Sequence, residues 1–89
     1  MNISNDGIEI TKRFFYAIDM LKKFKVIRGL QTFTRAHNIH YGNIAVVKKE
    51  PGKRIVKPEW IKWLCEDYDV SIDYIMFGKG HVFYDREAL

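Results

Sequence analysis

The stretch that decides the fold runs from Gln31 to Ile44 and reads QTFTRAHNIHYGNI. Apolar or ring side chains recur there at helical spacing, at Leu30, Phe33 and His37. The spacing predicts a short helix that begins after an N-cap at Gly29 and stops near Asn38. Asparagine suits the stop because it tolerates the left-handed backbone conformation of a tight turn.

A second helix is predicted to follow this turn from about Tyr41, with Ile44 and Val47 three residues apart on its buried face. Pro51 and Gly52 end it and open a basic loop. Two short helices joined by a turn of about four residues are the plan of a helix-turn-helix DNA binder. In that plan the second helix enters the major groove.

A longer helix is predicted before this pair, over residues 8–24. A capping box of Asp6 and Glu9 is expected at its start. Its apolar stripe consists of Ile10, Phe14, Ala17, Ile18 and Leu21.

Two further helices are predicted after the pair. The first of them starts at Pro58, and its core stripe consists of Ile61, Leu64, Cys65 and Tyr68. Ser71 is the N-cap of the last helix, and Gly78 closes it. The expected fold class is therefore all-α, a compact five-helix bundle with a central helix-turn-helix.

Length and composition restrict the possible functions. A chain of 89 residues forms one compact core, which excludes a multidomain enzyme. No apolar run approaches the ~20 residues of a membrane-spanning helix, and no signal-peptide pattern is present, so we expect a cytoplasmic protein, bacterial or phage-encoded and nucleoid-associated. The single cysteine excludes an intrachain disulfide and a cysteine-based metal cluster. We expect no cofactor, no metal and no enzymatic activity.

Positive charge is concentrated in the middle of the chain. Residues 12–62 hold thirteen Lys and Arg against three acids, a balance of +10, whereas residues 63–89 sum to −4 and residues 1–11 to −2. A basic segment of this kind attracts phosphate backbones. A solvated lysine face gives the same pattern, and we favour a polyanionic partner.

Two sequence motifs carry a family resemblance. The run from Gln31 to Ile44 and a closing run, VSIDYIMFGKG from Val70 to Gly80, occur in order with helix-sized spacing between them. Together they resemble the lambda-repressor-like (Xre/Cro) helix-turn-helix family, and the Gly-x-Gly ending is similar to phage-repressor-like regulators. The resemblance covers about residues 8–83. The chain departs from the family pattern at Thr34, where alanine is usual, and at Asn38, where glycine is usual.

The resemblance implies three parts: an N-terminal arm (1–7), a helix-turn-helix DNA-binding domain (8–78) and a C-terminal tail (79–89). It also implies a sequence-specific regulator of transcription, a repressor that binds a double-stranded DNA operator as a homodimer. The candidate dimer surface consists of the tail residues 81–84 with exposed parts of Trp60 and Trp63.

Two groups of residues are candidates for DNA contact. Those that face outward at the helix predicted from about Tyr41 and suit base contacts are His40, Tyr41, Asn43 and Val46. The start of the helix predicted after Gly29, and the basic residues that follow the helix from Tyr41, suit phosphate contacts. These candidates are Arg28, Gly29, Leu30, Gln31, Lys48, Lys49, Lys53 and Arg54.

Other interpretations stay open beside these. The chain can be a protein-interaction module on the same helical fold. We expect His37 to be packed or hydrogen-bonded rather than catalytic, because no partner for a catalytic pair is evident. Cys65 is expected to be a buried, small apolar residue rather than a nucleophile. Trp60 and Trp63 suit packing in the core or a dimer better than stacking on bases.

Overall fold

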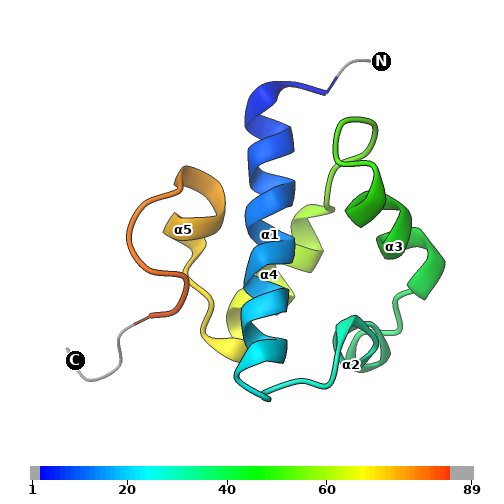
Figure 1. The fold of residues 1–89 in the computed structure, drawn as a ribbon, viewed down its shortest axis with the longest axis vertical. Helices are drawn as coiled ribbons and strands as arrows, with labels where there is room; N and C mark the ends of the chain where they lie inside the picture. The colour runs from blue at the N-terminus through cyan, green and yellow to red at the C-terminus, as the bar shows by residue number, and fades with distance from the viewer. Residues whose placement is uncertain (1–2, 85–89) are drawn as a thin grey trace.

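The computed structural model describes residues 3–84, which form five helices and confirm the all-α class. The helices are α1 (Asn5–Lys23), α2 (Leu30–Ala36), α3 (Tyr41–Lys49), α4 (Pro58–Tyr68) and α5 (Ile72–Phe77). Figure 1 shows α1 in the centre, with α2 and α3 to one side, α5 to the other and α4 crossing behind. Helix α1 packs against α3 and α5, and α4 packs against α5. None of the helices described is long and apolar enough to cross a bilayer.

Helix α1 begins three residues earlier than the sequence predicts. The Ser4 side chain accepts a hydrogen bond from the Gly7 N–H at 3.1 Å, so Ser4 is the N-cap. The expected capping box of Asp6 and Glu9 is therefore wrong, because the helix already starts at Asn5 and Asp6 lies within its first turn. Residues 5–7 of the expected N-terminal arm belong to the helix, and residues 1–2 lie outside the described residues.

The core is built on one face of α1. Phe14 and Ala17 are fully buried, and the Phe14 ring meets Phe33 of α2 edge-on, with ring centroids 6.1 Å apart. The other helices close over this face with buried aliphatic residues, at Ile44, Val47, Leu64 and Ile75. The predicted core stripes of α1 and α3 are confirmed, except that Ile10 is only partly buried.

The connection between α2 and α3 follows the predicted turn. Asn38 has a φ of 54°, in the left-handed region, and the Ile39 N–H donates to the Thr34 carbonyl at 2.8 Å. Thr34 is buried, and its hydroxyl donates to the Gln31 carbonyl at 3.0 Å. The hydroxyl that threonine has and alanine lacks therefore has a hydrogen-bond partner within α2.

The C-terminal half follows the predicted signals. Pro58 opens α4, Ser71 caps α5 by accepting from the Tyr74 N–H, and Gly78 ends α5 with a φ of 68°. Cys65 and Tyr68, two members of the predicted α4 stripe, are only partly buried. After α5 the chain turns back, and an antiparallel bridge pairs Val70 with Phe83.

One side chain joins the first and last helices. The Arg13 guanidinium of α1 donates from Nε to the Ile75 carbonyl at 2.8 Å and from Nη2 to the Met76 carbonyl at 3.2 Å. These carbonyls lie in the last turn of α5, where a helix has no internal donors left for them. Arg13 therefore caps the C-terminal end of α5.

We expect Thr11→Val to raise the free energy of unfolding by about 1 kcal/mol. Thr11 is fully buried on α1, and its hydroxyl finds no hydrogen-bond partner among residues 3–84, whereas valine keeps its shape without the polar atom. Urea unfolding followed by circular dichroism measures the change. Thr34→Val is the matched control and should lower stability, because the Thr34 hydroxyl is bonded. A destabilised Thr11→Val would show that the Thr11 hydroxyl has a partner in solution.

Candidate nucleic-acid interface

Two buried side chains set the rotation of α3. Ile44 is fully buried and Val47 is 4% exposed, so both face the core. Each residue of a helix is rotated by about 100° about the helix axis from the residue before it. The face of α3 opposite to Ile44 and Val47 is its outer face, and four residues lie on it. This outer face consists of Gly42, Ala45, Val46 and Lys49.

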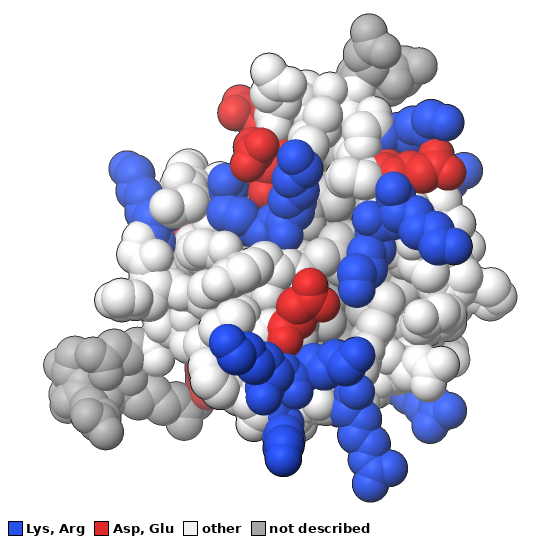
Figure 2. All heavy atoms as spheres, viewed as in Figure 1, with Lys and Arg blue, Asp and Glu red and all other residues white. Residues whose placement is uncertain are grey.

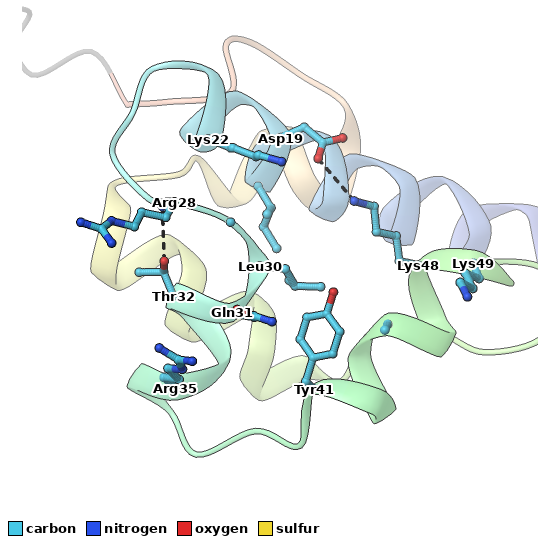
Figure 3. Close-up of a pocket in the computed structure, with 13 residues that line it drawn as sticks. Asp19, Lys22, Arg28, Leu30, Gln31, Thr32, Arg35, Tyr41, Lys48 and Lys49 are labelled. Atoms are coloured by element: carbon cyan, nitrogen blue, oxygen red, sulfur yellow. Dashed lines mark hydrogen bonds and ion pairs between the residues drawn. The ribbon is translucent and has the colours of Figure 1, made fainter.

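An open hollow of about 720 Å³ lies along one side of α3, between α3, the second half of α1 and the start of α2. We call it the basic hollow, because its charged lining consists mainly of Lys22, Arg28, Arg35, Lys48 and Lys49. The one acid among its lining residues is Asp19, whose Oδ1 lies 3.5 Å from the Lys48 Nζ. Figure 3 shows this pair above the ring of Tyr41, with Arg28 and Arg35 on the α2 side.

The start of α2 forms the floor of the basic hollow. Gly29 precedes the helix as its N-cap and offers no side chain, so no side chain caps the first N–H groups. The Arg28 N–H donates to the Thr32 hydroxyl at 3.3 Å, which holds the approach to the helix. Leu30 and Gln31 line the hollow beside these groups.

The other side of α3 borders a second depression, which we call the crevice. Asn43, Val46, Arg54, Lys57 and Trp60 line it, and its volume is about 450 Å³. An adjoining depression shares Asn43, Lys57 and Trp60 and extends to His37 and His40. The Lys57 ammonium lies 5.7 Å from the centre of the Trp60 ring, so a cation stands at this border too.

The two depressions give α3 a cationic border on each side. Figure 2 shows Lys and Arg side chains gathered over the α2 side and over the α3 side of the molecule, while the α5 side of that face carries few charges. The outer face of α3 lies between the basic hollow and the crevice. This arrangement suits a polyanion that passes on both sides of the helix.

The structure divides the residues predicted from sequence between these two depressions. Six of the eight phosphate candidates line the basic hollow, namely Arg28, Gly29, Leu30, Gln31, Lys48 and Lys49. The other two lie apart from it: Arg54 lines the crevice, and the Lys53 Nζ lies 3.3 Å from the Glu50 Oε2. Of the base candidates, Tyr41 lines the basic hollow, whereas His40, Asn43 and Val46 line the crevice or its extension.

Four charged residues that line these depressions are not among the candidates predicted from the sequence. Lys22, Arg35 and Asp19 line the basic hollow, and Lys57 lines the crevice. Helical spacing contains a signal for one of them, because Arg35 lies four residues after Gln31 and shares its face of α2. Lys22 and Asp19 join the site through the packing of α1 beside α3, which local spacing does not reveal.

The tryptophans differ from the expected dimer surface. Trp60 is 4% exposed and belongs to the hydrophobic core, so the prediction that part of it is exposed at a dimer surface is wrong. Trp63 stacks on the His37 ring, with centroids 4.5 Å apart and an interplanar angle of 2°. In the tail, Phe83 packs against Phe24 of the same chain, with centroids 6.5 Å apart, while Tyr84 stays half exposed.

His37 has the packed and hydrogen-bonded surroundings that the sequence predicts. The expectation that it has no partner is wrong, because its Nε2 lies 2.5 Å from the Asp67 Oδ2, a carboxylate 30 positions away in the sequence. Burial, with Glu66 nearby, raises the pKa of the Cys65 thiol to about 11, which keeps the thiol protonated at neutral pH. Within residues 3–84, no group of three or more His, Cys, Asp or Glu side chains is placed to hold a metal ion.

Comparison of the chain with protein-family models, with curated proteins and with solved structures found no match.

Proposed function

We propose that the chain is a sequence-specific regulator of transcription that binds double-stranded DNA, with α3 in the major groove. The observation that carries the proposal is the cationic border on both sides of α3, with Arg28 and Lys49 in the basic hollow and Arg54 and Lys57 in the crevice. A major groove is bordered by a phosphate backbone on each side, and α3 with its small outer side chains is narrow enough to enter it. Repression and action as a homodimer on an operator in the bacterial cytoplasm come from the family resemblance and belong to the proposal.

Salt dependence tests the proposal. Fluorescence anisotropy of a labelled random-sequence duplex pool, titrated with the protein, should show affinity falling about 10³-fold between 50 and 200 mM salt if roughly six phosphates are contacted. The double variant Arg28→Ala/Lys49→Ala should reduce the slope of log affinity against log salt by about two.

A second double variant provides the matched control. Lys62→Ala/Lys79→Ala removes the same charge, but Lys62 lies at a groove shared with Ile72 and Met76, and Lys79 follows α5. This control should leave the slope nearly unchanged. Equal effects of both variants would contradict the location of the interface, and a folded protein that binds no duplex at low salt would overturn the proposal.

A specific surface also supports the second candidate function, a protein-interaction module. A groove lined almost wholly by apolar atoms runs between α1, α4, α5 and the loop before α4, and Ile55, Ile72 and Met76 are partly exposed in it. An exposed apolar groove suits a protein partner, and binding there would depend weakly on salt.

A further inference from the structure

The outer face of α3 offers apolar groups rather than hydrogen-bonding groups to a ligand. Lys49 is the single residue there with a polar side chain, and it also lines the basic hollow. Ala45 and Val46, at the centre of the face, are partly exposed and end in methyl groups. Gly42, the fourth member, has no side chain of its own, and the His40 imidazole lies against it, with Cε1 3.0 Å from where a Cβ would be.

Two neighbouring residues of α3 border the crevice with different chemistry. Asn43 is exposed and has an amide, while Val46 lies three residues further on, about one turn along the helix. A planar amide matches the N6 and N7 edge of adenine with two hydrogen bonds. The apolar feature on a major-groove edge is the C5-methyl group of thymine, which suits contact with an alanine or valine side chain.

We propose that α3 selects A·T base pairs through the thymine methyl group, with Val46 and Ala45 packing on methyls and Asn43 bonding to adenine. The inference rests on the proposed function and names the DNA that it would read. An A·T pair presents both features on its major-groove edge, whereas a G·C pair presents neither the methyl nor the adenine pattern. Cations in the basic hollow and the crevice position α3 without contributing to this choice.

Replacing thymine by uracil in one duplex tests the inference, because uracil pairs with adenine in the same way and lacks only the methyl. A duplex enriched by the protein from a random pool is synthesised with thymine or with uracil under the α3 footprint. Affinity for the uracil duplex should fall about fourfold for each methyl contacted. The salt slope should stay the same, because the phosphates are unchanged.

Three variants test the methyl contacts, the adenine contact and the phosphate contacts separately. Val46→Ala should lower the thymine-to-uracil affinity ratio, and Ala45, which keeps its own methyl contact, should hold the ratio above one. Asn43→Ala should keep that ratio while relaxing the preference for adenine in the selected sequences. Lys49→Ala is the control and should weaken binding to both duplexes equally. Thermal unfolding by circular dichroism shows that each variant is folded.

The affinities for the two duplexes distinguish failure of the methyl inference from failure of the DNA-binding proposal. Equal affinity for the thymine and uracil duplexes, or enrichment of G·C pairs under α3, would overturn the methyl inference and leave the DNA-binding proposal standing. Failure of the folded protein to bind any duplex would overturn both.

Discussion

Phe14→Ala is expected to lower the free energy of unfolding by about 3–5 kcal/mol. Phe14 has no exposed surface, its ring meets Phe15 edge-on at a centroid distance of 5.1 Å, and it also packs on Phe33. The substitution removes the whole phenyl ring between α1 and α2 and leaves a cavity that neighbouring helices cannot fill without moving. A loss of this size is a large part of the total stability of a small domain, about 5–15 kcal/mol.

Urea unfolding followed by circular dichroism measures the loss, with Tyr16→Ala as the matched control. Tyr16 is an aromatic residue on the same helix but is 49% exposed, so its removal should cost about 1 kcal/mol or less. If the two substitutions cost the same, Phe14 would not be at the centre of the core.

Ala45→Glu is expected to weaken duplex binding at least about 100-fold at low salt. Ala45 lies on the outer face of α3 and lines the basic hollow, so in the proposed complex a carboxylate there would repel the DNA phosphates and compete with them for the cations of the hollow. Glutamate is a good helix former, so α3 itself should persist. Anisotropy titration of the enriched duplex measures the loss.

Ala45→Gln separates charge from size in this experiment. Glutamine has nearly the shape of glutamate without its charge, so this variant should bind much more tightly than Ala45→Glu, and the gap should narrow as salt is added. Equal losses in the two variants would point to steric exclusion, and normal binding by Ala45→Glu would remove α3 from the interface.

The helix boundaries were largely predictable because local chemistry sets them. Asn38, Pro58, Ser71 and Gly78 each act within a few residues of their own position, and all four lie where the sequence places them. The start of α1 was mispredicted because two neighbouring N-caps were possible, and the helix begins after Ser4, whose side chain accepts from the Gly7 N–H, rather than after Asp6.

The composition of the interface was less predictable because it depends on packing between distant segments. Lys22 reaches the basic hollow only because α1 lies beside α2 and α3, and Arg54 is separated from Lys48 by the path of the loop. The pairing of His37 with Asp67 joins residues 30 positions apart. No local spacing contains that information.

The hydrogen bonds from Arg13 to the end of α5 make the two ends of the fold depend on each other. They join positions 62 and 63 residues apart, and a six-residue helix such as α5 has little stability of its own. We therefore expect the backbone amides at the end of α5 to exchange their hydrogens with solvent chiefly when α1 separates from it, with α1 and α5 opening as one cooperative unit. Helices α2 and α3 take no part in this link, because both Arg13 hydrogen bonds end on α5.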